Sequence, residues 1–162
     1  MRQTIKGIGQ YEVSIVVFYG RDLYCPTADE LNSGVETPKE RSVYARIDGG
    51  GLGGGDVYLM SQNRDWLELR KNSWIMLKGR EVAFQIGTFA VRRNVFKWYR
   101  VVNLDDIVEE QNLPNGQPGF GRFVTLAGPD WQVRTTPADI AEAAIIDDVV
   151  GVYTTLVDVN SL

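Results

Sequence analysis

Hydrophobic and polar residues alternate in short stretches along this chain, with the period of two that is typical of β-strands. The clearest stretch is 42–48, where alternate apolar side chains are expected to face inward. These inward residues are Val43, Ala45 and Ile47, and the outward ones are Tyr44 and Arg46. Strand-like segments recur at 57–60, 122–126 and 149–159, between stretches of turn residues. The pattern predicts an all-β fold, a small antiparallel β-barrel or sandwich.

The segment 11–19 differs because both of its faces are largely apolar. One face is expected to carry Val13, Ile15, Val17 and Tyr19. The other carries Val16 and Phe18, with Ser14 as its polar member. A strand with two apolar faces is either covered on both sides or turned toward a neighbouring subunit.

The segment 66–102 is predicted to form the centre of the fold. It contains three of the four tryptophans and two strand-like runs, 73–77 and 95–102. A third β-prone run, 81–91, lies between them. Aromatic and β-branched residues at this density suit a pleated, half-buried surface, where cross-strand packing supplies the stability.

Three segments bear on helix content. Thr27 and Glu30 have the spacing of a capping box, which predicts a short helix through Leu31. The acidic segment 104–110 is expected to form one helical turn. The segment 135–146 is open between a helix that starts at Thr136-Pro137 and a hairpin with an acidic turn at 147–148. We therefore predict a single β-rich domain over 1–162 with one or two short helices.

A run of glycines interrupts the strand pattern before residue 57. It consists of Gly49, Gly50, Gly51, Leu52, Gly53, Gly54 and Gly55. Glycine has the most backbone entropy to lose, so we expect a flexible hairpin tip or arm that is ordered by assembly. The run also satisfies the dinucleotide-binding pattern G-x-G-x-x-G, but a strand-like segment follows it where a helix is needed. No cofactor is expected.

Composition excludes the catalytic and metal sites that depend on histidine or on several cysteines. The 162 residues include no histidine and one cysteine, Cys25. Catalytic triads that need histidine, zinc sites built from cysteine or histidine, and an internal disulfide are therefore excluded. The acidic clusters at 105–110 and 147–148 lack the ligand spacing of a calcium loop, so we interpret them as solvated charge. We expect no catalytic residues, no metal site and no enzyme activity.

The net charge and hydropathy of the chain limit the partners that we expect it to bind. A net charge of −4 and a pI near 4.9 argue against a broad attraction to nucleic acid or to anionic membranes. No apolar run is long enough to cross a bilayer, and residues 1–6 do not resemble a signal peptide. We expect synthesis in a host cytoplasm and no membrane partner.

One local cluster mixes basic and aromatic residues, and we treat it as a candidate partner-binding surface. Its members are Arg92, Arg93, Lys97, Trp98, Tyr99 and Arg100. OB-type barrels use such mixtures to hold single-stranded nucleic acid. The plainer expectation is that the face with Phe96 and Trp98 packs in the core, with Arg100 at its edge.

Several of these segments together resemble known proteins. Leu69, the run 74–77 and the run 98–102 are similar to segments of the small barrels in tailed-bacteriophage neck, tail and decoration proteins. With 124–131 and 149–153 added, the chain is also similar to segments of large uncharacterised bacterial proteins. Neither resemblance carries functional residues onto this chain. What they imply is a β-rich assembly or surface module.

The leading expectation is a structural protein that self-associates or docks in a larger particle. The particle we expect first is a phage virion, with this chain as a neck, tail or capsid decoration component. Its partners are expected to be copies of itself and other structural proteins of the particle. One alternative is an OB-like module for single-stranded nucleic acid, although nucleic acid is not the expected partner. Another is a bacterial surface or pilus-associated β module, which the absence of a recognisable signal peptide disfavours.

Overall fold

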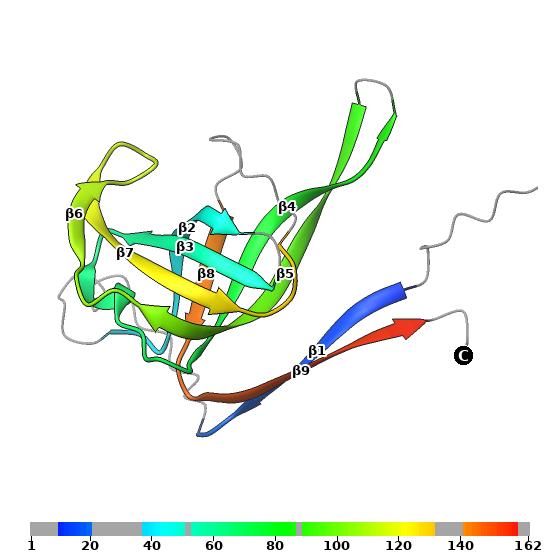
Figure 1. Cartoon of the computed structure of the whole chain (residues 1–162), viewed down its shortest axis with the longest axis horizontal. Coiled ribbons are helices and arrows are strands. Elements are labelled where there is room, and N and C mark those ends of the chain that lie inside the picture. The colour runs from blue at the N-terminus through cyan, green and yellow to red at the C-terminus, as the bar shows by residue number, and fades with distance from the viewer. Residues whose placement is uncertain (1–9, 21–36, 51–52, 87–88, 132–140, 159–162) are drawn as a thin grey trace, which may run out of the picture.

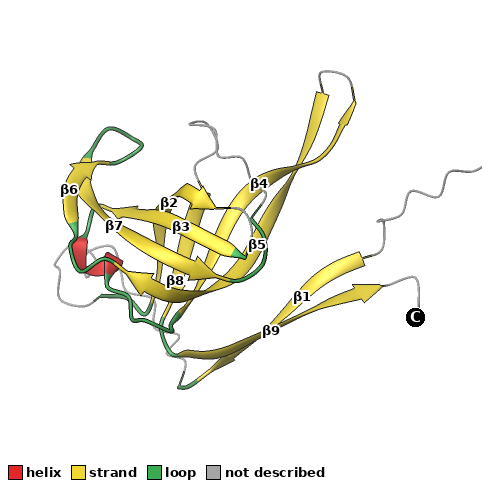
Figure 2. Ribbon diagram, viewed as in Figure 1, coloured by secondary structure: helices red, strands yellow, loops and turns green. Residues whose placement is uncertain are grey.

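The computed structural model describes residues 10–20, 37–50, 53–86, 89–131 and 141–158. Within these ranges nearly all regular structure is strand, and the one helical element is a single 3-10 turn (Figure 2). The strands are β1 (Gln10–Phe18), β2 (Glu40–Gly50), β3 (Gly54–Ser61), β4 (Trp74–Ile86), β5 (Phe89–Leu104), β6 (Glu109–Asn112), β7 (Pro118–Ala127), β8 (Ala141–Ile146) and β9 (Val149–Asp158). The 3-10 turn is η1 (Arg64–Leu67). The predicted all-β class is confirmed. The capping box at 27–30 lies outside the described residues.

Six of the strands close into an antiparallel barrel (Figure 1). They follow one another in the order β3-β2-β8-β4-β5-β7, and β7 pairs back to β3. β7 joins β3 along one edge, from Phe120 to Ala127. Its other edge is shared by β5, which pairs near Ala127, and by β6, which pairs near Pro118. β6 is therefore an extra strand beside the closed barrel.

The barrel interior is filled by alternate residues of its strands. The segment 42–48 behaves as predicted, with Val43 and Ala45 buried and Arg46 exposed. The largest fully buried side chains are Tyr99, Leu59, Leu67, Ile75, Leu77, Ile145, Val101 and Val124. Burial of these apolar side chains is the main favourable contribution to folding.

The expectation for the aromatic face of β5 was wrong. The alternation itself is as predicted, but Tyr99 and Val101 face the core and are fully buried. Phe96 is 50% exposed and Trp98 is half-buried, because both point out of the barrel wall. Alternation assigns residues to two faces, whereas the partner strands β4 and β7 decide which face is inside.

In two further segments the secondary structure differs from an expectation based on the sequence. Residues 105–108 form an irregular loop, and Glu109 starts β6, so the expected helical turn is absent there. In 135–146, the described part 141–146 is strand β8. The alternative of a strand in this segment is therefore correct. The expected hairpin between this strand and the next one is wrong. β8 pairs with β2 and β4, whereas β9 pairs with β1.

Two arginines hold the 3-10 turn against the barrel. Arg41 is 6% exposed, and its guanidinium donates to the carbonyl oxygens of Trp66 at 2.9 Å and Glu68 at 2.6 Å. Arg122 donates to the carbonyl oxygen of Leu67 at 3.1 Å. Asn63 caps the start of the turn by accepting from the Asp65 amide. Backbone carbonyls that η1 leaves without strand partners are satisfied in this way.

Candidate interaction surface

The first and last described strands form a separate two-stranded sheet, the β1–β9 ribbon. β1 and β9 pair antiparallel from Gln10 opposite Asp158 to Phe18 opposite Val149. Figure 1 shows the ribbon running along the outside of the barrel and extending past it. Its main contact with the barrel is between β9 and β4. A two-stranded sheet by itself is at best marginally stable in water, so it needs a further strand or layer.

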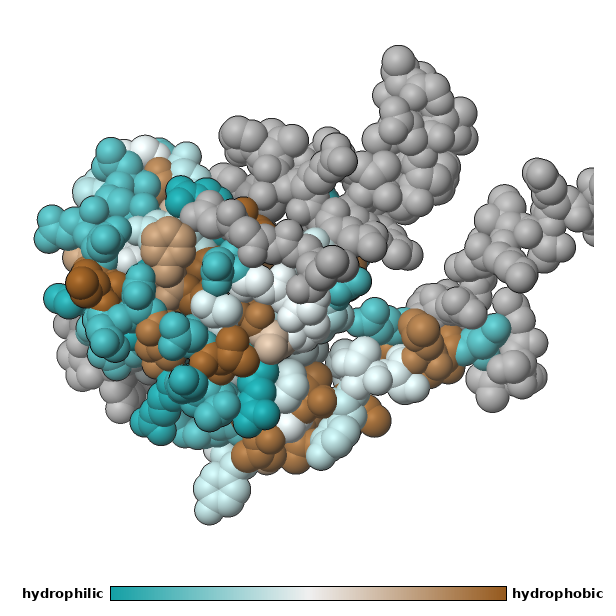
Figure 3. Space-filling view, viewed as in Figure 1, coloured by the Kyte–Doolittle hydropathy of each residue, from teal (hydrophilic) through white to brown (hydrophobic). Residues whose placement is uncertain are grey.

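The outer face of the ribbon is apolar and exposed. Ile15 is 60% exposed, and its cross-strand partner Tyr153 is 68% exposed. Val13 and Val17 lie on the same face, each 42% exposed. The other face contains Val16, Phe18 and Val152, which are half-buried. Figure 3 shows hydrophobic side chains exposed along the ribbon. The predicted face of Val13, Ile15 and Val17 is thus confirmed, and it is exposed along its length. The opposite face is half-buried near Val152 and exposed toward its far end, where Leu156 is 71% exposed.

The edges of the ribbon carry none of the basic residues or prolines that often protect exposed strands. Neither β1 nor β9 contains a lysine, an arginine or a proline. Natural edge strands use such residues, or very short lengths, to prevent pairing with another chain. β6, the extra strand beside the barrel, follows this rule: it has four residues and begins with Glu109-Glu110. The ribbon is the exception in this fold.

An acidic turn fixes the point where the chain leaves the barrel for the ribbon. Asp147 accepts from Arg41 at 2.8 Å, and Asp148 accepts from Lys39 at 3.0 Å. The Asp148 carbonyl also accepts from the Tyr19 amide at 2.8 Å, which joins the end of β1 to the turn. Asp148 has a φ of 64°. The interpretation of 147–148 as solvated charge needs refinement, because both carboxylates are held in ion pairs.

The glycine stretch forms the end of the β2–β3 hairpin. Gly49 and Gly50 close β2, Gly54 and Gly55 open β3, and residues 51–52 lie outside the described ranges. Gly50 pairs with Gly55 across the hairpin. Gly54 also pairs with Ala127 of β7, so this end of the stretch belongs to the barrel wall. Its role as an assembly arm stays a prediction.

Gly53 connects the hairpin to the end of β7. Its amide donates to Asp130 Oδ1 at 2.8 Å, and its carbonyl accepts from the Gly128 amide at 3.0 Å. These bonds tie the described part of the stretch to the same chain.

The described side chains of the basic and aromatic set on β5 do not share one face. Arg92 and Arg93 lie where β4 and β5 pair only with each other, and this end of the hairpin projects beyond the barrel (Figure 1). Lys97 donates to the Asp130 carbonyl at 2.7 Å. Tyr99 is buried, so its ring is not accessible for stacking on a base. Trp98 and Arg100 point outward from the barrel wall.

Comparison of the chain with protein-family models, with curated proteins and with solved structures gives no match.

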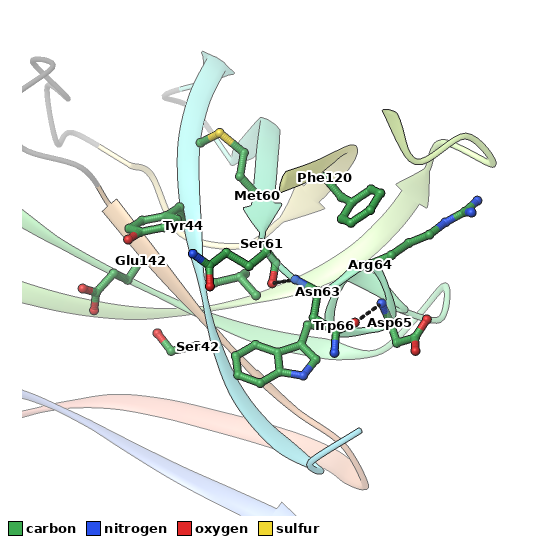
Figure 4. Close-up of a pocket in the computed structure, with 12 residues that line it drawn as sticks. Ser42, Tyr44, Met60, Ser61, Asn63, Arg64, Asp65, Trp66, Phe120 and Glu142 are labelled. Carbon is green, nitrogen blue, oxygen red and sulfur yellow. Dashed lines mark hydrogen bonds between the residues drawn. The ribbon is translucent and has the colours of Figure 1, made fainter. Parts of the chain in front are cut away.

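A cavity of about 810 Å³ opens at the end of the barrel beside the 3-10 turn (Figure 4). Trp66, Tyr44 and Phe120 supply aromatic rings to its lining. The charged groups do not converge in it: Arg64 extends away from the rings, and Glu142 is ion-paired with Lys78 at 2.6 Å. The amide of Asn63 and its side chain are used within the turn itself. This arrangement offers no nucleophile with an adjacent base.

The described part of the chain also bears on metal binding and on membrane spanning. No group of three or more Cys, Asp or Glu residues in these ranges could hold a metal ion. None of the helices in these ranges is both long enough and apolar enough to cross a membrane.

Tyr99 and Trp131 form an edge-to-face pair in the core with ring centroids 6.0 Å apart. Tyr99 Oη and Trp131 Nε1 are buried and have no hydrogen-bond partner among the residues that the structure describes. Burial, together with the negative charges of Glu12 and Asp130, raises the pKa of the Tyr99 phenol well above its usual range. The phenol is therefore neutral at physiological pH and serves packing.

Sequence reasoning found one half of the exposed face and missed the other. Val13, Ile15 and Val17 were recognisable because apolar residues occupy both faces of their strand. Tyr153 was missed because its face is defined by pairing with β1, which lies more than a hundred residues away in the chain. The available signal was the composition of β9, whose only charged residue is its last, Asp158.

Proposed function

We propose that this chain is a structural protein that acts by association within a larger particle, with the outer face of the β1–β9 ribbon as its docking surface. The observation that supports this is the exposure of Ile15 and Tyr153 side by side, flanked by Val13 and Val17. No charged residue lies between Val13 and Phe18 or between Val149 and Val157. A contiguous apolar face of this kind is typical of a protein–protein contact.

The mechanism is burial of surface, without bond chemistry. Leaving aliphatic side chains in water costs about 25 cal/mol for each Å² of apolar area, and docking recovers that free energy. The barrel supplies a rigid base, and the ion-paired turn at Asp147 and Asp148 sets where the ribbon leaves it. Partners in this proposal are copies of the chain and other structural proteins of the particle.

The particle that we propose is the virion of a tailed bacteriophage, in which the chain is a neck, tail or decoration component. Support comes from the resemblance of the segments around Trp74 and Trp98 to the small barrels of such proteins. These segments form the paired strands β4 and β5 of the barrel wall.

The experiment uses one change at two equally exposed isoleucines. Ile15 is 60% exposed on the ribbon, and Ile107 is 69% exposed in the loop before β6. Each is replaced by lysine in the native gene, and particles from the producing cells are separated on a density gradient. An antibody against the chain then measures its content in the particle band.

We expect the wild type and Ile107→Lys in the particle band and Ile15→Lys in the soluble fraction. Circular dichroism of purified Ile15→Lys checks that the variant is folded. Equal incorporation of the two lysine variants would contradict docking through the ribbon. Absence of the wild type from every particle fraction would contradict the structural role itself.

A further inference from the structure

The two edges of the ribbon are not equivalent. The pairing runs regularly from Gln10 to Val17, but Val17 faces Gly151 while Phe18 faces Val149. Val150 is therefore an extra residue on β9, and it is 61% exposed. A bulge bends a strand and disturbs the hydrogen bonding of its edge, which is one way in which edges are protected. β1 has no extra residue, so its edge is the regular one.

The geometry points to a second copy of this chain as the occupant of the β1 edge. We infer that β1 pairs antiparallel with β1 of the second copy about a two-fold axis at Ser14, giving a sheet in the order β9-β1-β1-β9. This inference rests on the proposed function and names the partner of the same surface. Closed two-fold dimers are the commonest symmetric assemblies, and this pairing needs no change in the ribbon.

Charge supports self-pairing along β1. The only ionisable side chains of the strand are Glu12 and the phenol of Tyr11. With the axis at Ser14, residue Glu12 lies opposite Val16 and not opposite the second Glu12. Like charges directly across a strand pair are destabilising, and this register avoids them. Glu12 is thus the one charged carboxylate on this strand.

The same register keeps the apolar face continuous. Residues that lie equally far before and after Ser14 face each other across the axis and point to the same side of the sheet. Val13 of one copy therefore lies opposite Ile15 of the other. All the outward side chains then stay on one side of the four-stranded sheet. A register shifted by one residue would place the apolar face of one copy beside the opposite face of the other.

Area gives a second reason for self-pairing. Nine residues at about 3.3 Å each and two strands about 4.8 Å apart give one ribbon face roughly 300 Å². A stable interface buries about 800 Å² on each partner. One ribbon face is well below this size. A paired sheet doubles the face to roughly 600 Å² and adds backbone hydrogen bonds along the new edge. Self-pairing therefore brings the docking surface nearer to the size of a stable interface.

A single-cysteine cross-link tests this register. Ser14 is replaced by cysteine in a Cys25→Ser background, which leaves one thiol in the full chain. Opposite residues of an antiparallel pair have Cα atoms about 4.5–5.5 Å apart, within the range of about 4.4–6.8 Å that a disulfide spans. Mild oxidation of Ser14→Cys is expected to give a disulfide-linked dimer on a non-reducing gel.

Thr154→Cys is the matched control. Thr154 lies opposite Ser14 within the ribbon, and the two hydroxyls are 2.9 Å apart, so both variants lose the same hydrogen bond. In the paired sheet the two Thr154 positions are three strand spacings apart, about 14 Å, which no disulfide spans. We expect Thr154→Cys and the remote Ile107→Cys to run as single chains on the same non-reducing gel, because neither thiol lies within disulfide distance of its copy.

A Ser14→Cys dimer yield no greater than that of Ile107→Cys would overturn the inference. So would a dimer of Thr154→Cys without one of Ser14→Cys, because the pairing would then use β9. The inference and the proposed function fail separately. A chain that enters particles without the Ser14 cross-link docks on a different protein, and a chain that forms the cross-link but enters no particle pairs without the structural role.

Discussion

Arg41 and Asp147 form an ion pair in which the two side chains differ sharply in exposure. Arg41 Nη1 lies 2.8 Å from Asp147 Oδ2, and the side chains are 2% and 45% exposed. The guanidinium also donates to the Pro38 carbonyl and to the two carbonyls beside the 3-10 turn. One buried cation thus connects β2, the 3-10 turn and the turn that leads to the ribbon.

Replacing Arg41 by methionine is expected to lower the free energy of unfolding by about 3 kcal/mol, since it leaves several buried carbonyl oxygens without donors. Urea denaturation followed by tryptophan fluorescence measures the change. Lys78→Met is the control, because Lys78 and Glu142 are 46% and 43% exposed. An exposed pair of this kind contributes under about 1 kcal/mol. Equal losses for the two variants would show that Arg41 is not a structural cation.

The two glycines at the start of β3 are expected to tolerate alanine differently. Gly53 and Gly54 both have positive φ, 68° and 113°. A Cβ on Gly54 would lie 2.2 Å from the Leu126 carbonyl oxygen, whereas a Cβ on Gly53 meets nothing within 4 Å. We expect Gly53→Ala to cost about 1 kcal/mol from backbone strain alone and Gly54→Ala about 3 kcal/mol, because β3 must also move away from β7. Thermal unfolding distinguishes the two, and equal costs would contradict the close approach of these strands.

Tyr99 gives a prediction at high pH. The phenol of an unfolded chain titrates near pH 10, and burial raises the pKa of Tyr99 in the folded state. The stability is therefore complete below about pH 10 and falls above it, by about 1 kcal/mol at pH 11, because only the unfolded state releases the proton readily. Tyr99→Phe is expected to remove this part of the loss and to cost little at pH 7, since Tyr99 Oη has no partner among the described residues.

Urea unfolding at pH 8 and pH 11 measures the effect. The control is Tyr153→Phe, because Tyr153 is 68% exposed and its replacement should leave the alkaline loss at the wild-type value. If Tyr99→Phe loses as much stability between these pH values as the wild type, the phenol is not held in its neutral form by burial.

The sequence pattern was sufficient for the fold class because the period of two is local to each strand. The inward residues Val43 and Ala45 were found in this way. Pairing was not predictable, since β8 lies between β2 and β4 in the sheet although β9 follows it in the sequence. For the same reason the face of β5 with Phe96 and Trp98 was expected in the core, whereas the structure buries Tyr99 on the other face. The glycine stretch was recognised as a hairpin end, while its attachment to Asp130 depends on a contact across the barrel.

From the sequence, only the half of the candidate surface that lies on β1 was predictable. An apolar residue such as Ile15 on a two-faced strand indicates either burial or a neighbour, and the alternation cannot choose between them. The choice follows from tertiary structure, because β1 pairs with β9 outside the barrel and leaves its outer face open.

The most direct test of the account is light scattering behind a sizing column, on the purified wild type, Ile15→Lys and Ile107→Lys, over a range of concentrations. We expect the wild type and Ile107→Lys to exceed the 18.2 kDa of one chain as the concentration rises. Ile15→Lys should remain a monomer, with at least about tenfold weaker association, because a lysine protects the strand edge and adds charge to the apolar face. A wild type that stays monomeric at every concentration, or three proteins that associate equally, would contradict self-association through the ribbon.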